Sequence, residues 1–172
     1  MIVLYHGTTL RLEQPLACVG REDLDFGKGF YLTRLRDQAE RWVIRVQLIR
    51  LSSDAWINMY GFDLEAALNA GAKMLSFEAY DRHWLDFIVA SRNGEKPWSG
   101  YDIIEGGVAD DRVIDTVEDY ISGNITVDQA LGKLRYTSPN NQICILSQSL
   151  LDKYLRFVDS ERLNDIREGR PV

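Results

Sequence analysis

The sequence predicts an α+β fold in a single domain, and three observations support this fold class. Segments typical of strands and helices are mixed along the chain without regular strand-helix-strand alternation. A chain of 172 residues with 45% apolar side chains can form one hydrophobic core. The chain also shows no internal repeat. We expect the domain to occupy residues 1–160, and the charged residues 161–172 to be a helical remnant or a frayed tail.

The first two predicted strands are each adjacent to a glycine-containing segment. Residues 2–5 form a short apolar run that ends at His6-Gly7-Thr8-Thr9, a loop that can expose backbone groups to a ligand. The polar segment Asp25-Phe26-Gly27-Lys28-Gly29 leads into residues 30–33, a β-prone run that contains Tyr31. The sequence therefore predicts a strand followed by a ligand loop, and a second strand entered through flexible glycines.

An amphipathic helix is predicted after the second strand, because apolar residues recur there at helical spacing. It begins near Thr33 or Arg34 and ends before Ser52-Ser53. Its apolar stripe consists of Leu35, Ala39, Trp42, Val43, Val46 and Ile49. Beyond it, the sequence predicts a strand at 56–60, a helix at 64–70 closed by Gly71, and a strand near 74–77.

The second half of the chain contains further predicted helices and strands. Asp81 can cap a helix that is apolar around much of its surface from Trp84 to Val89, so we expect this helix in the core. Thr126 and Gln129 match a capping box. Besides the helix at 81–89, the expected elements are a loop at 94–100, a strand at 101–105 with a turn at 106–107, helices from 110 or 111 to 121 and from 126 to 134, a central strand within 140–146, and a strand at 155–158.

Composition and charge argue against several classes of function. With 20 basic and 26 acidic side chains the net charge is -6, which argues against binding to nucleic acid mainly by phosphate attraction. The net charge does not exclude a local basic groove. The chain shows no signal peptide and no apolar run long enough to span a bilayer, so we expect a cytoplasmic protein without a membrane partner. Cys18 and Cys144 fit no metal-ligand or disulfide spacing and are expected to be packing residues.

Three segments together resemble the active-site strands of the ADP-ribosyltransferase superfamily, in its diphtheria-toxin-like branch with a His-Tyr-Glu pattern. They are Tyr5-His6-Gly7-Thr8, the run GKGFYLT at 27–33, and Asn140-Asn141-Gln142. Their order matches the family from residue 4 to residue 146. The run DFGKGFYLT at 25–33, with YDII at 101–104 and VADD at 108–111, is similar to a bacterial family of uncharacterised domains assigned to this superfamily. Each segment alone is a weak signal, and their ordered conjunction carries the resemblance.

The resemblance implies a split β-sheet core with flanking helices. It also implies a mono-ADP-ribosyltransferase that cleaves the nicotinamide glycosidic bond of NAD and passes ADP-ribose to a macromolecular acceptor, either protein or nucleic acid. NAD is the substrate of this reaction, and no metal is required. A small free-standing member resembles the toxin of a bacterial toxin-antitoxin pair, which implies an antitoxin protein as a partner.

The same resemblance assigns roles to individual residues. The catalytic residues would be His6, Tyr31 and Gln142, and NAD would be bound by His6, Gly7, Thr8, Gly29, Tyr31 and Trp42. The backbone of Gly7 would bind the nicotinamide carboxamide, His6 a ribose hydroxyl, and Thr8 the adenosine side. The Tyr31 ring would pack on the nicotinamide. Trp42 either stacks on the other face of the nicotinamide or packs in the core, because it also belongs to the apolar stripe.

Gln142 departs from the family pattern. The family usually has glutamate there, which hydrogen-bonds the ribose 2′-hydroxyl and stabilises a cationic transition state, whereas glutamine carries no charge. A neutral amide can orient the ribose but cannot act as a general base, which favours transfer of a single ADP-ribose over chain elongation. One alternative is a catalytically silent module that binds NAD or ADP-ribose. Another is a structural or partner-binding domain whose apolar helices at 84–89 and 113–121 form an interface.

Charged residues near these motifs each allow two interpretations. Glu105, Asp110 and Asp111 are the nearest acids that could act as a base for the acceptor, but an aspartate pair before a helix is more often a cap. Asp25 can simply order the loop before Tyr31. In the helix after the second strand, five arginines exceed two acids by three positive charges (5 - 2 = 3): Arg34, Arg36, Arg41, Arg45 and Arg50 against Asp37 and Glu40. This face either guides the NAD pyrophosphate or a nucleic-acid acceptor, or is a solvated helix surface.

Overall fold

The protein has two β-sheets side by side, with helices packed against them and at one end. The computed structural model describes residues 1–19, 24–109, 111–135, 137, 140 and 142–163. Within these residues there are six α-helices, seven strands and two short 3-10 helices. In chain order they are β1 (Ile2–Thr8), η1 (Ala17–Val19), β2 (Phe30–Leu32), α1 (Arg36–Arg50), β3 (Trp56–Phe62), α2 (Leu64–Asn69), β4 (Met74–Ser76), α3 (Arg82–Arg92), η2 (Pro97–Gly100), β5 (Ile103–Gly106), α4 (Asp111–Ile121), α5 (Val127–Leu134), β6 (Gln142–Ile145), α6 (Gln148–Tyr154) and β7 (Leu155–Arg162). The predicted α+β class is confirmed.

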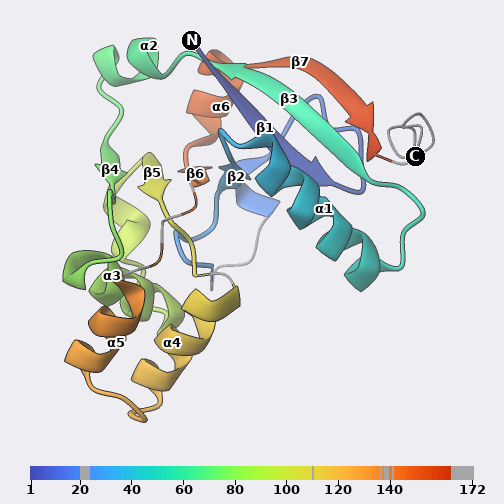
Figure 1. Ribbon diagram of the computed structural model, residues 1–172. Helices are drawn as coiled ribbons and strands as arrows, with labels where there is room; N and C mark the ends of the chain where they lie inside the picture. Colours follow the sequence, from blue (N-terminus) through green and yellow to red (C-terminus); the bar gives the residue numbers. More distant parts are fainter. Residues whose placement is uncertain (20–23, 110, 136, 138–139, 141, 164–172) are drawn as a thin grey trace.

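The two sheets meet along β1 and β2. One sheet has the order β1-β3-β7 and is antiparallel, and the other has the order β2-β6-β5-β4, in which β4 and β5 are parallel. They are joined where Tyr5 of β1 and Thr33, just after β2, form a bridge with two backbone hydrogen bonds of 2.8 and 2.9 Å. Figure 1 shows the three-stranded sheet with α1 at one end of the molecule and the helices α3, α4 and α5 at the other.

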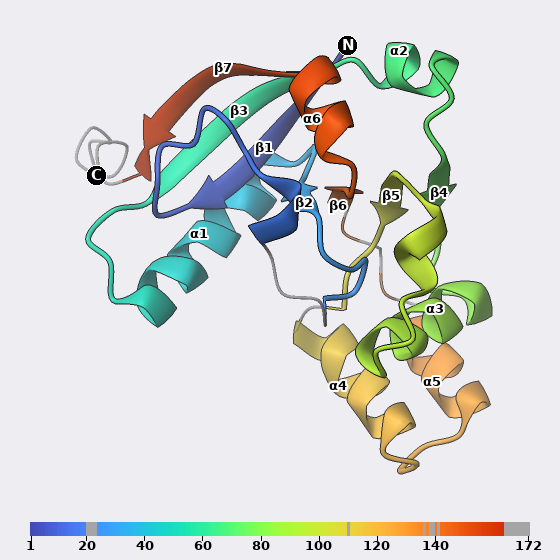
Figure 2. The same cartoon turned by 180° about the vertical axis from the view of Figure 1, so that it is seen from behind.

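Buried side chains of the described residues form three clusters, one of them between α1 and the three-stranded sheet, and the other two lie on opposite faces of β2. Phe30 and Leu32 of β2 pack with residues of β1, β3 and α6, whereas Tyr31 faces the cluster that contains Trp84 of α3 and Val117 of α4. Strand side chains alternate between the faces of a sheet, which explains this division. In Figure 2 α6 and α2 lie at the opposite end of the molecule from α4 and α5.

The apolar faces of α3 and α4 belong to the core, since Trp84 and Val117 are fully buried. The interpretation of these two helices as a partner interface is therefore wrong. Their boundaries agree with the sequence: the side chain of Asp81 caps α3, and Thr126 and Gln129 form the expected capping box of α5. In the described part of the chain, no helix combines the length and the apolar composition needed to cross a bilayer.

Several boundaries differ from the sequence-based expectation. β1 continues through His6 and Gly7 to Thr8, because these residues pair with β3 as far as Trp56, so the expected ligand loop is a strand. β7 continues to Arg162, into the region expected to be a tail, because it pairs with all of β3; residues 164–172 of that tail lie outside the described residues. α6 was not expected, since its seven residues are too few for a clear helical period. Cys18 is exposed and is not a packing residue, whereas Cys144 is buried.

Asp25 fixes the segment that leads into β2. Its carboxylate accepts hydrogen bonds from Nε and Nη2 of Arg92 on α3, at 2.9 and 2.7 Å, and from the backbone N–H of Ala109 at 2.7 Å. Gly27 follows with a φ of +79°, and a Cβ atom there would lie 2.3 Å from the ring of Trp98. Asp25 and Gly27 therefore have structural roles in this motif, in agreement with the expectation that Asp25 orders this loop.

Replacing Asp25 by alanine should lower the free energy of unfolding by about 3 kcal/mol, because it leaves the largely buried Arg92 guanidinium and the Ala109 N–H without their acceptor. Equilibrium unfolding in urea measures this loss. The control is Lys133→Ala, whose partner Asp119 lies at 3.4 Å on the surface, and which should cost less than about 1 kcal/mol. Equal losses in the two variants would contradict the role given to Asp25.

Candidate functional site

The three residues singled out by the sequence lie on three neighbouring strands. His6 is on β1, Tyr31 is on β2, and Gln142 is the first residue of β6. The structure brings His6 and Tyr31 into contact, since Nδ1 of His6 donates a hydrogen bond of 2.8 Å to the backbone carbonyl of Tyr31. Gln142 lies two residues before Cys144, the β6 partner of Tyr31, and so shares the sheet face of Tyr31.

The imidazole of His6 is neutral at physiological pH. The pKa of His6 is lowered to about 4, mainly by burial and in smaller part by the nearby Arg50, while the hydrogen bond to the Tyr31 carbonyl opposes this shift. A carbonyl oxygen only accepts hydrogen bonds, so Nδ1 carries the proton and Nε2 is left as an acceptor. The ring packs on Phe30 with centroids 4.6 Å apart, which fixes its orientation. His6 therefore offers a hydrogen-bond acceptor of fixed direction.

The backbone of Gly7 faces the line where the two sheets part. Both backbone groups of Tyr5 bond to Thr33 on the β2 side. Backbone groups of alternate strand residues point the same way, so the N–H and C=O of Gly7 also point towards β2 and away from β3. Continued pairing would put Tyr31 opposite Gly7, but in the described chain the Tyr5–Thr33 bridge is the only one between β1 and β2. The N–H and C=O of Gly7, a buried residue, therefore point to the place beside Tyr31 where β1 and β2 part. We call this strand separation the opening between β1 and β2.

Gly7 also lies against α1, which explains why it carries no side chain. A Cβ atom at this position would be 2.3 Å from the backbone oxygen of Ala39 and 3.0 Å from Cβ of Val43. Residue 29 is a glycine for a similar reason, because a Cβ atom there would lie 2.5 Å from Sγ of Cys144. Thr8 is the last residue of β1 and pairs with Trp56. For Gly29 the contacts show packing against β6, and its expected role in binding NAD stays a prediction.

Tyr31 anchors the loop that precedes its own strand. Its hydroxyl donates to the carbonyl of Gly27 at 2.7 Å and accepts from the N–H of Phe26 at 3.1 Å. Burial raises the pKa of the Tyr31 hydroxyl well above its ordinary value, so the group stays protonated. The thiol of Cys144, which faces Tyr31, also has a pKa raised by burial and stays protonated. The ring is only partly buried, so the packing role and a role in stacking are compatible.

Trp42 is not a core residue. It is 48% exposed, and Ile49 of the same expected stripe is 75% exposed, so the core-packing interpretation is wrong for both. The helix is held instead through Ala39, Val43 and the buried Gln38, whose Oε1 accepts from Oγ1 of Thr33 at 3.0 Å. Residues four apart lie on one side of a helix, so Trp42 is on the side of α1 that turns towards Thr33.

Several arginines of this region have acidic partners within the chain. Arg34 pairs with Glu105 at 3.0 Å, and Arg36 pairs with Glu40 and Glu161. Arg50 donates to Oγ1 of Thr9 at 3.3 Å, next to the end of β1. Three of the five arginines counted for this helix therefore have partners within the chain, and Arg41 is exposed on α1. Asp110 and the side chain of Asp111 lie outside the described residues.

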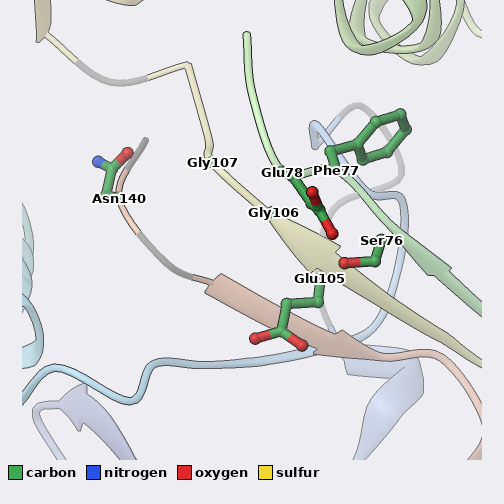
Figure 3. Close-up of a pocket in the computed structure, with 7 residues that line it drawn as sticks. All are labelled: Ser76, Phe77, Glu78, Glu105, Gly106, Gly107 and Asn140. Atoms are coloured by element: carbon green, nitrogen blue, oxygen red, sulfur yellow. The ribbon is translucent and has the colours of Figure 1, made fainter. Parts of the chain in front are cut away.

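A pocket of about 400 Å³ opens at the end of the four-stranded sheet, where β4 and β5 end and β6 begins. Figure 3 shows its lining: Ser76, Phe77, Glu78, Glu105, Gly106, Gly107 and Asn140. Gly106 is the β5 partner of Gln142, so the pocket begins one strand away from that residue. The sequence singled out Glu105 but not Ser76 or Glu78, because Ser76 ends a short strand, Glu78 follows it, and neither belongs to a motif.

The described residues hold no group of three or more His, Cys, Asp or Glu side chains arranged to bind a metal ion. The groups that the residues singled out by the sequence offer to a ligand are the Nε2 acceptor of His6, the backbone donor and acceptor of Gly7, the ring of Tyr31 and, on β6, the amide of Gln142. These groups are themselves uncharged and suit a ligand with an amide and hydroxyl groups, and they include no nucleophile.

The sequence profile of one protein family, described as "Protein of unknown function (DUF3990)", matches residues 2–157. The match includes β1 to β6, the first residues of β7, the six α-helices, and the positions of His6, Tyr31 and Gln142. No curated protein and no solved structure gives a match to the chain.

Changing His6 to glutamine should flatten the dependence of stability on acid pH. Because the pKa of His6 is about 4 when folded and about 6.5 when unfolded, the unfolded chain binds an extra proton between these values. Stability therefore falls as pH falls, by up to about 1 kcal/mol per pH unit between pH 6 and 4.5. Urea unfolding of both proteins over this range measures the difference, in which all other titrating groups cancel. Parallel curves would show that His6 is not held neutral.

Proposed function

The chain belongs to the DUF3990 family, whose description names no activity, and we propose from the site that the protein is a mono-ADP-ribosyltransferase that uses NAD. It would cleave the nicotinamide glycosidic bond and transfer ADP-ribose to a macromolecular acceptor. One observation carries this proposal: where the two sheets part, a neutral histidine is bonded to the backbone of Tyr31, and the backbone of Gly7 points towards the same strand.

The strand order supports the proposal. Taken across the Tyr5–Thr33 bridge, the strands follow one another as β4-β5-β6-β2 and β1-β3-β7. Three strands far apart in the sequence thus become neighbours, and each carries one residue of the His-Tyr-Gln set. This is the kind of split sheet with flanking helices that the resemblance to ADP-ribosyltransferases implies.

The nicotinamide end of NAD would bind at the opening between β1 and β2. A carboxamide has one acceptor oxygen and an NH₂ donor, which complement the N–H and C=O of Gly7. The exposed part of the Tyr31 ring would pack on the pyridinium ring and shield it from water. Because the Tyr31 hydroxyl is held by Phe26 and Gly27, the ring is fixed before the ligand arrives. Such preorganisation lowers the entropy lost on binding.

His6 would accept a hydrogen bond from a ribose hydroxyl through Nε2. This needs the neutral form with its proton on Nδ1, which burial and the Tyr31 carbonyl both favour. A cationic imidazole would instead add positive charge beside an oxocarbenium-like ribose, which would raise the barrier. The lowered pKa of His6 is therefore consistent with its proposed position beside the reacting sugar.

Gln142 would orient the nicotinamide ribose from β6. Among the described residues its side chain has no hydrogen-bond partner, which leaves the amide available to a ribose hydroxyl. Because an amide cannot stabilise positive charge as a carboxylate does, cleavage should be slow, and the transfer should stop after one ADP-ribose. The same neutrality favours the second candidate function, a silent module that binds NAD without cleaving it.

Trp42 would close the site from the α1 side. It lies one helical turn beyond Gln38, which contacts Thr33 on the face of the sheet that carries Tyr31. Its exposure of 48% leaves the indole free to cover a ligand.

By the resemblance to ADP-ribosyltransferases, the protein would act in the cytoplasm as a toxin, and an antitoxin protein would restrain it.

Nicotinamide release tests the proposal. Purified protein is incubated with adenine-labelled NAD and a cell lysate treated with nuclease or protease; we expect free nicotinamide and label fixed on one class of macromolecule. Trp42→Ala should cut release at low NAD concentration at least tenfold without unfolding the protein, because Trp42 is exposed. Leu48→Ala, exposed on the same helix, should have no effect. Equal release by both variants, or none by the wild type, would refute the transferase.

Gln142→Glu separates the transferase from the silent module. A carboxylate at this position should raise nicotinamide release at least tenfold in an enzyme, and should create release in a module that only binds NAD. Gln142→Ala is the matched loss-of-contact variant, and calorimetry gives the affinity for NAD in each case. If neither substitution alters release or affinity, Gln142 does not contact the ribose.

A further inference from the structure

The outer side of α1 carries more apolar surface than the fold uses. The helix packs on the three-stranded sheet through Ala39 and Val43. At its C-terminal end the side chains of Leu48 and Ile49 are 71% and 75% exposed, and Leu51, which follows the helix, is 92% exposed. Single exposed leucines are common on protein surfaces, but three apolar side chains so close together form a patch, which often marks a binding surface. In Figures 1 and 2 the last turn of α1 lies at the edge of the molecule.

Leu51 has a backbone conformation that glycine would adopt more readily. Its φ is +50° and its ψ is 38°, in the left-handed region that bulky L-residues avoid. Its N–H bonds to the carbonyl of Leu48 and the next N–H bonds to that of Gln47, a pattern that commonly has glycine at this position. Leu51 therefore lowers stability through its backbone, and its exposed side chain does not offset this by packing. A residue that breaks a local rule without structural compensation is expected at a functional surface.

Arginines accompany these apolar side chains. The segment 41–51 contains three arginines and no acid, although the whole chain has a net charge of -6. Arg41 and Arg45 are exposed and stand four and seven residues from Leu48, so the three share one side of α1. At 100° per residue, Ile49 lies on one flank of this line and Leu51 on the other. We call these five side chains the outer patch of α1.

The composition of the outer patch selects among possible partners. Nucleic acid would use the arginines but not the exposed aliphatic side chains, and the net charge of -6 opposes it. The same net charge opposes an anionic lipid surface. A second copy placed by a two-fold axis would bring arginines against arginines, which repel. A protein segment that carries carboxylates beside apolar side chains matches both features of the patch.

We propose that the outer patch of α1 binds an acidic amphipathic helix of another protein. The patch is the convex side of a helix whose backbone groups bond within the helix, so it offers side chains and no strand edge to an extended chain. A partner helix packs on such a surface by fitting its side chains between those of α1. Its apolar residues would cover Leu48, Ile49 and Leu51, and its carboxylates would pair with Arg41 and Arg45. The patch includes no residue proposed to hold NAD, so this inference is independent of the proposed function.

A synthetic peptide tests the outer patch. The probe is a fluorescent helical peptide with leucines along one stripe and glutamates on both sides of it, and fluorescence anisotropy measures its binding to the full-length protein. The same peptide with lysine in place of glutamate should not bind. Leu48→Ser and Arg41→Glu should each weaken the affinity about tenfold, because they remove an apolar contact or reverse a charge. Leu68→Ser, at an exposed leucine of α2, is the matched control and should leave the affinity unchanged.

Leu51→Gly separates a binding role from a structural one. Glycine should raise the urea concentration at the midpoint of unfolding, because it suits the left-handed conformation. The same substitution should weaken peptide binding, because the exposed side chain is lost. A lower midpoint would show that Leu51 serves the fold and would contradict its place in the patch.

The outcomes decide the proposal. Amide signals of the ¹⁵N-labelled protein that shift only within residues 41–51, with the losses expected for the variants, would support it. A peptide that fails to bind, binds equally well in its lysine version, or binds Leu48→Ser as tightly as the wild type would overturn it. Binding to phosphatidylglycerol vesicles through the same residues, without binding to the peptide, would overturn the partner helix and assign the patch to a lipid surface.

Discussion

The two sheets of the protein are joined by backbone hydrogen bonds between Tyr5 and Thr33, and the strands separate immediately beyond them. Every backbone group near such a separation needs a partner, because an unpaired buried donor or acceptor costs about 1 to 3 kcal/mol. His6 supplies one partner, since its imidazole reaches across to the Tyr31 carbonyl. The backbone of Gly7 faces the same opening, beneath α1, whose close approach permits only glycine. The candidate site follows directly from this separation of strands.

Much of the motif that precedes β2 is architecture that holds Tyr31 in place. Asp25 connects this segment to α3 and to the residues after β5, and Gly27 makes room for Trp98. Through its hydroxyl, Tyr31 closes the same loop that positions its own strand. A single side chain therefore serves both the fold and, in the proposed function, the ligand.

The sequence predicted the α+β class, most helices and the strands that carry His6, Tyr31 and Gln142, because apolar periodicity and caps such as Asp81 and Thr126 are local signals. It failed where long-range pairing decides the outcome. Because they pair with β3, residues 6–8 form a strand where a loop was predicted, and β7 is longer than predicted. Trp42 shows the limit of periodicity. The apolar residues of α1 extend around more of the helix than the side that packs against the sheet, so Trp42 is exposed. Glu78 could not have been found, since its place beside Glu105 depends on the parallel β4–β5 pair.

A crystal structure with a non-hydrolysable NAD analogue tests the central claim, that the opening between β1 and β2 is a nicotinamide site, most directly. The proposed function predicts the carboxamide of the analogue on the N–H and C=O of Gly7, its ring against Tyr31, and Nε2 of His6 on a ribose hydroxyl. An analogue bound elsewhere, or an opening in which Gly7 is paired with protein groups and no analogue binds, would contradict it.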